Sequence, residues 1–229
     1  MTQPNDKDEE RTQTPVHPIY WWMANRIEPF RQASGPPPQT LWPFLGWALE
    51  GTGREIKIAV FASICVGIAT VTGMFLIGWL IDEAQATGPG FLAAEWWKYA
   101  VVAGFYLTIW PLAMVINAAF NSVALGPNVF ALTLSRLNRY TLGQSLSYFD
   151  NDFAGRIAQK KQQTARAMME VVNETTNIAG NAAATAIGAA VMLGFTDWRL
   201  ASVVLLWIAA FVFLIRWYVP KIRVRSQHR

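Results

Sequence analysis

Four long apolar stretches alternate with polar segments along the chain, and their lengths predict helices that cross a membrane. The uncharged stretches cover residues 58–81, 99–134, 175–195 and 200–215. A helix rises about 1.5 Å per residue, so roughly 20 apolar residues cross the hydrocarbon layer of a bilayer. The second stretch is longer, and we expect its helix to continue into water with a bend at Gly126–Pro127. The predicted spans are therefore about 58–81, 99–121, 175–195 and 199–219.

The composition agrees with a membrane protein. Of the 229 residues, 53% are hydrophobic and 15% are charged, whereas a soluble domain carries about a quarter charged residues. Cys65 is the only cysteine, and His17 and His228 lie in opposite tails, so neither a disulfide nor a metal site is expected. The predicted fold class is an all-α, polytopic membrane helical bundle. The lipid bilayer is therefore an expected partner of the protein.

The positive charges predict the orientation of the chain, because Lys and Arg collect on the cytoplasmic side of a membrane. Of the 19 basic residues, 17 lie before the first span, between the second and third spans, or after the fourth. Only Lys98 and Arg199 lie in the other two connections. We therefore expect a multi-pass protein of the plasma membrane, in bacteria the inner membrane, with both termini in the cytoplasm. Topology explains the basic charge, so no nucleic-acid partner is expected.

The residues before the first span divide into two parts. Residues 1–35 are predicted to form a cytoplasmic tail, and residues 36–54 a proline linker and a short helix. This helix, over 40–50, is rich in Leu, Phe and Trp and too short to cross a bilayer, so it is predicted to lie in the membrane interface. A partly ordered lead-in is the alternative. Residues 55–229 would form the membrane domain.

The polar segment 135–174, here named the polar hairpin, is too long for an ordinary loop between spans. Its composition favours a helix on each side of a turn, and arms of about 20 residues would carry that turn about 30 Å from the membrane. Gly155 is expected to give the chain the freedom to reverse. A hairpin that contacts only other segments of its own fold is the alternative. The residues predicted to bind a partner are Tyr148, Phe149, Asp150, Asn151, Asp152, Phe153, Gly155 and Arg156.

This turn resembles the first intracellular loop of ABC exporters. The resemblance rests on Tyr148-Phe149-Asp150, followed by Gly155-Arg156-Ile157 and a polar helix. The order of elements over 38–229 is also similar, from an interfacial elbow helix to a fourth helix that returns to the cytoplasm. The resemblance implies part of a type-1 transmembrane domain with long cytoplasmic helix extensions. It also implies that residues 148–156 form a coupling helix, which rests on a nucleotide-binding domain and transmits its ATP-driven motion.

The same resemblance implies partners that this chain does not encode. They are a nucleotide-binding domain that holds ATP and Mg, and a second transmembrane half or homodimer partner. No GxxxxGK[ST] phosphate loop occurs in the sequence, so we expect no catalytic residue, no cofactor and no ATPase activity in the chain itself. The family has six spans and four are predicted here. Three functions stay open: an exporter component, an inert or dominant-interfering fragment, and an independent four-span adaptor.

A polar stripe follows the third span. Asn173, Asn177, Asn181 and Thr185 recur every four residues and therefore share one helix face. One hypothesis is that the stripe lines a transport pathway opposite the second helix. The other, which we favour, is that asparagine hydrogen bonds and neighbouring small residues hold the helices together. The candidate pathway residues are Asn117, Asn121, Asn177, Asn181 and Thr185.

Overall fold

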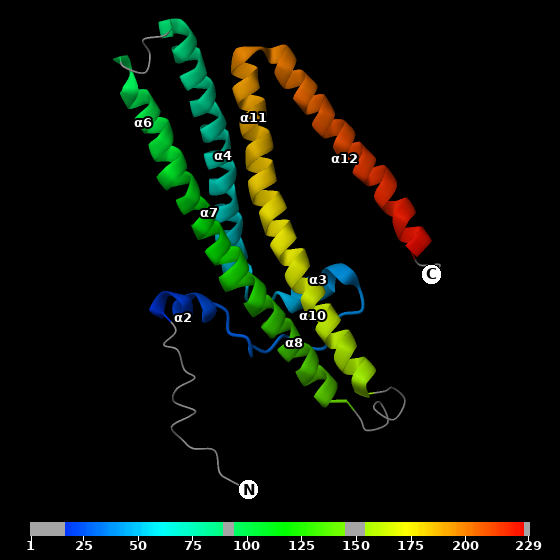
Figure 1. The fold of residues 1–229 in the computed structure, drawn as a ribbon. Coiled ribbons are helices and arrows are strands. Elements are labelled where there is room, and N and C mark those ends of the chain that lie inside the picture. The colour runs from blue at the N-terminus through cyan, green and yellow to red at the C-terminus, as the bar shows by residue number, and fades with distance from the viewer. Residues whose placement is uncertain (1–16, 89–93, 145–153, 227–229) are drawn as a thin grey trace.

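In the computed structural model, residues 17–88, 94–144 and 154–226 are described, and all their regular structure is helical. Long helices run side by side, and two short ones lie across them (Figure 1). The prediction of an all-α bundle is confirmed. We call the end from which the polar hairpin extends the hairpin end of the bundle.

The chain enters the bundle through two short helices, α2 (Pro18–Ala24) and α3 (Leu41–Ala48). The second of them lies within residues 40–50, where the sequence predicts a short aromatic helix, and its position in the membrane interface stays a prediction. Gly51 follows it with a φ of 87°, a left-handed conformation that glycine adopts without strain. The chain then turns directly into α4 (Gly53–Thr87), which contains the first predicted span.

The second long helix runs without a break from Trp96 to Leu142 over 47 residues. Two of its turns are π-helical, and each precedes a proline, Pro111 or Pro127. Proline cannot donate the next main-chain hydrogen bond, and a wider turn accommodates that loss. The feature predicted at Gly126–Pro127 is therefore a π-helical turn inside a continuous helix. Its parts are α6 (Trp96–Gly104), η2 (Phe105–Ile109), α7 (Trp110–Ala118), η3 (Ala119–Leu125) and α8 (Gly126–Leu142).

The third and fourth long helices meet at a single residue. Asp197 is extended, with φ −156° and ψ 122°, and its Oδ1 accepts a hydrogen bond of 2.9 Å from the Arg199 N–H. This side chain caps the start of the fourth helix, as expected for a tight connection. The elements are α10 (Ala154–Asn177), η4 (Ile178–Ala182), α11 (Ala183–Thr196) and α12 (Trp198–Ser226).

Three helices of the described residues are long and apolar enough to cross a membrane. They contain the predicted spans 58–81, 99–121 and 175–195. The apolar part of α12 is shorter, Ser202–Tyr218, so the span predicted over 199–219 stays a prediction. The side of the membrane on which the termini lie also stays a prediction.

Two packing features position the candidate site. The arms α8 and α10 of the polar hairpin pack against each other along their length (Figure 1), around a core at the hairpin end that includes Val129, Leu132, Met168 and Val172. In contrast, α12 packs against α11 and diverges from the other helices (Figure 1). Its large apolar side chains, among them Leu206 and Trp207, are therefore exposed.

Candidate functional site

The tip of the polar hairpin is only partly described. Of the predicted coupling residues, Tyr148, Phe149, Asp150, Asn151, Asp152 and Phe153 lie outside the described residues. Gly155 and Arg156 form the first turn of α10, and both are exposed. Gly155 does not have a positive φ, and no heavy atom lies within 4 Å of where its Cβ would be. It occupies an ordinary helical position, and the turn that precedes it lies outside the described residues, so its role in the reversal of the chain stays a prediction.

The predicted polar residues of the second helix meet α4 and α10 in one hydrogen-bonded cluster. Asn117 Oδ1 accepts hydrogen bonds from Ser63 Oγ at 2.8 Å and from Asn121 Nδ2 at 2.7 Å. Thr176 Oγ1 donates to Asn121 Oδ1 at 2.7 Å. Asn121 is 2% exposed, and its side-chain amide joins the second helix to Ser63 of α4 and Thr176 of α10. Sequence reasoning missed Ser63, a single polar residue in an apolar span, and Thr176, which lies in a polar run but outside the four-residue repeat of the stripe.

Farther from the hairpin end, the polar stripe of the third helix borders a groove. Asn177, Asn181 and Thr185 are half-buried and line an open groove of about 690 Å³ that also includes Thr70 and Trp207. Thr185 Oγ1 donates to Asn181 Oδ1 at 3.2 Å, which leaves other polar capacity of both residues toward the groove. Asn117 and Asn121 therefore lie in a packing cluster, and Asn181 and Thr185 lie beside an open groove. Asn177 takes part in both, because it lines the groove and its Oδ1 accepts a hydrogen bond of 3.4 Å from Asn117 Nδ2. A pathway role stays a prediction.

Glycines allow the third helix to approach α4 closely. A Cβ added at Gly180 would lie 2.5 Å from Ser63 Cβ and 2.7 Å from the Val60 carbonyl oxygen. A Cβ at Gly67 would lie 2.7 Å from Ala184 Cβ. Such distances are shorter than real carbon contacts, so these glycines are needed for the observed approach.

A buried arginine joins the N-terminal segment to the hairpin. Arg136 of α8 is 4% exposed, and its guanidinium donates to the carbonyl oxygens of Arg31, Trp47, Ala48 and Glu50 at 3.1, 2.6, 3.1 and 2.9 Å. The last carbonyls of a helix lack intrahelical partners and carry partial negative charge. Arg136 therefore caps α3 and attaches it to α8.

The sequence analysis counted Arg136 only as a topological charge. Its position carried a further signal, because it follows the buried Val129 and Leu132 at seven and four residues, on the same helix face. A second buried contact attaches the segment that follows α2 to the start of α4. Arg26 Nε lies 2.7 Å from Glu55 Oε2, and both side chains are largely buried. Together these contacts fix the N-terminal segment to the start of α4 and to the second helix.

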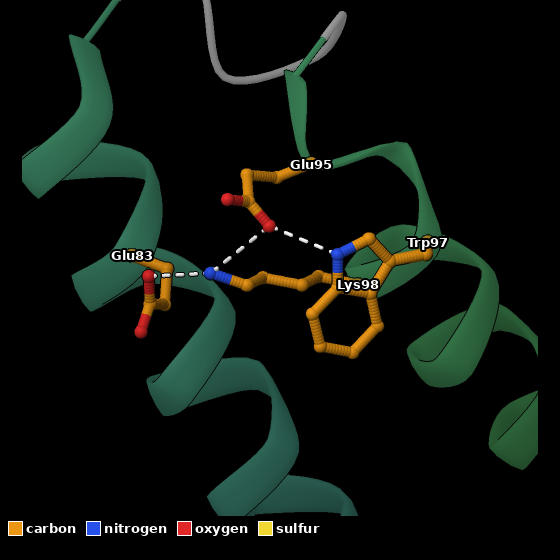
Figure 2. A network of polar contacts seen from close by, with 4 residues as sticks. All are labelled: Glu83, Glu95, Trp97 and Lys98. Atoms are coloured by element: carbon orange, nitrogen blue, oxygen red, sulfur yellow. Dashed lines mark hydrogen bonds and ion pairs between the residues drawn. The ribbon is translucent and has the colours of Figure 1, made fainter.

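A third polar contact closes the opposite end of the bundle. Lys98 Nζ lies 2.6 Å from Glu83 Oε2 and 3.3 Å from Glu95 Oε2, and Trp97 Nε1 donates to the same Glu95 oxygen at 2.9 Å. Figure 2 shows the ammonium between the two carboxylates, with Glu83 on α4 and Lys98 on α6. This contact ties the two helix ends. Among the described residues, no group of acidic, His or Cys side chains could hold a metal ion.

Comparison with known proteins gives one distant relative. The chain is 25% identical over 213 residues to a Haemophilus influenzae protein named "Uncharacterized ABC transporter ATP-binding protein". The match covers 92% of this chain and 34% of the relative, so the chain spans about one third of the length of the protein it matches. No protein-family model matches, and no solved structure matches.

Proposed function

We propose that the chain is the membrane-spanning (permease) part of an ATP-driven ABC exporter, which moves a solute or a lipid across the membrane. In this proposal the chain supplies the first four helices of a type-1 transmembrane domain. Residues 148–156 couple it to a nucleotide-binding domain. ATP and Mg would be held by that domain, so this chain contributes motion and a pathway, with no hydrolytic chemistry of its own.

The observation that carries the proposal is the continuity of the hairpin arms with the apolar helices. Each arm and its apolar helix form one helical run, Trp96–Leu142 and Gly155–Phe195. Helices α8 and α10, which contain the arms, also pack against each other, and Leu132 of α8 and Met168 of α10 belong to one buried cluster. A force applied at the tip would therefore move both helices together. An ordinary loop would absorb such a force by bending.

Lipid or a partner within the membrane can cover the exposed apolar face of α12, and we propose a partner. Leu206 is 73% exposed and Trp207 is 65% exposed, and α12 diverges from the other helices. A second transmembrane half or a homodimer partner would cover this face. The groove beside Asn177, Asn181 and Thr185 adjoins α12, and we propose it as part of the pathway between the two halves.

Coupling is tested by Phe149→Ala in the complete transporter, reconstituted with its nucleotide-binding domain. The expected result is loss of transport while ATP hydrolysis and membrane insertion persist, because the substitution removes an aromatic anchor that would join tip and motor. Gln159→Ala, at an exposed position of α10, is the matched control and should behave as wild type. Transport by the Phe149 variant at the wild-type rate would show that the coupling assignment is wrong.

A further inference from the structure

A basic pocket opens between the N-terminal segment and the second helix at the hairpin end. It has a volume of about 560 Å³, and its lining includes Arg31, Arg136 and Arg139 but no Asp or Glu. Glu50 interacts electrostatically with Arg31 and Arg136. However, its carboxylate accepts hydrogen bonds from Ser34, and it does not line the pocket. The pocket therefore carries a net positive charge.

The three arginines have different tasks. Arg136 is buried, and four of its five N–H donors are used by main-chain carbonyls, so it contributes mainly charge. Arg139 is exposed and donates to the side-chain oxygen of Gln32 at 2.9 and 3.0 Å when that amide is oriented to accept. Gln32 is neutral, so the charge of Arg139 is not compensated by it. Arg31 is exposed as well, and no ion pair within 4 Å joins either exposed arginine to a carboxylate among the described residues.

The position of the pocket suits a membrane surface. Its lining includes Trp47 of α3, a helix whose opposite side exposes Leu41 (56%) and Trp42 (80%). Exposed apolar and indole groups on a short helix lying across the bundle favour the boundary between headgroups and acyl chains. At the rim of the pocket, Phe30 is 78% exposed. An apolar rim beside a basic interior matches a molecule with a phosphate and hydrocarbon chains.

We infer that this pocket binds the phosphate headgroup of an anionic phospholipid in the leaflet next to α3. Arg31 and Arg139 supply the direct contacts, and Arg136 adds fixed positive charge behind them. The acyl chains lie along the exposed side of α3. The lipid would thus hold together the same two elements, the N-terminal segment and α8, that Arg136 joins from the inside. This binding is independent of the proposed transport role.

The test uses the full chain in phosphatidylcholine nanodiscs doped with spin-labelled phosphatidylglycerol, and in matched discs with spin-labelled phosphatidylcholine. Electron paramagnetic resonance then reports the immobilised fraction of each lipid. The expected result is a preference for phosphatidylglycerol that falls about fivefold in Arg139→Gln and again in the double variant with Arg31→Gln, since each basic residue at a membrane surface contributes about 1 kcal/mol. Both side chains are exposed, so the fold should persist.

Arg54→Gln is the matched control. Arg54 is exposed at the start of α4 and does not line the pocket, so this substitution removes the same charge from a position outside the pocket. An equal loss of preference in this control would overturn the site, since general surface charge would then explain binding. A preference unchanged in the double variant would also overturn it. An excess of inorganic phosphate should leave the immobilised fraction of phosphatidylglycerol unchanged. Displacement of phosphatidylglycerol by inorganic phosphate would identify a soluble anion as the occupant of the pocket and would refute the lipid proposal.

Discussion

Replacement of Arg136 by methionine tests whether one side chain attaches α3 to the hairpin. The variant keeps much of the buried apolar volume but removes four hydrogen bonds to main-chain carbonyls. Removal of a buried charged donor costs about 3 kcal/mol or more, because its acceptors stay buried without partners. With about 1.4 kcal/mol per factor of ten, local opening of residues 41–52 should become about 100-fold more frequent.

Hydrogen exchange with mass spectrometry in nanodiscs measures this opening directly. The peptide that covers α3 should exchange about 100-fold faster in Arg136→Met, and by an intermediate factor in Arg136→Lys, because an ammonium keeps the charge but lacks the fork of donors. Arg54→Met changes an exposed arginine near the same end and should leave the exchange unchanged. Exchange in Arg136→Met within about threefold of wild type would refute the reasoning, since the hydrogen bonds would then contribute less than about 1 kcal/mol.

Three further outcomes are expected. Gly180→Ala should lower the unfolding free energy by about 1–3 kcal/mol in thermal denaturation, because its Cβ would overlap Ser63, while Gly78→Ala, with open space at that position, should not. Hydrogen bonds from Ser34 hold the pKa of Glu50 below its ordinary value. The stabilisation is therefore present above the unfolded pKa and lost as pH falls through the folded one. The protection factor of the Ser34 amide, which is the intrinsic exchange rate at each pH divided by the observed rate, should therefore fall in acid, and a pH-independent protection factor would oppose this. Asn181→Cys should react with a water-soluble thiol reagent in an assembled transporter, and no labelling there would defeat the pathway hypothesis.

Much of the fold could be predicted from the sequence, because hydrophobic length and helix composition are local properties. The stretches 58–81 and 175–195 lie within α4 and the third helix, and the two arms of the hairpin are helical. The fourth stretch is shorter, since the apolar part of α12 covers Ser202–Tyr218 alone. Local sequence also indicated a feature at Pro127 but not its form, because a π-helical turn depends on how the whole helix packs.

The contacts between distant segments could not be predicted in the same way. The carbonyl groups that Arg136 contacts lie between 86 and 105 positions earlier in the chain. No local sequence pattern predicts which carbonyl groups these are. The polar residues of the second and third helices were recognised from the sequence, but the environment of each side chain depends on its neighbours in space. Asn121 is buried against Ser63 and Thr176, whereas Asn181 faces a groove next to α12. Spacing alone assigns both to a polar face and does not distinguish packing from access.

The central claim is that the tip of the polar hairpin touches an ATPase. The most direct measurement places a photo-crosslinking amino acid at Phe149 in the complete transporter and analyses the crosslinked products in cells. The account predicts a crosslink to the nucleotide-binding domain that is lost when the crosslinker is moved to Gln159. Labelling of a cysteine at Phe149 by an impermeant reagent from outside the cell, without any crosslink to the ATPase, would contradict it.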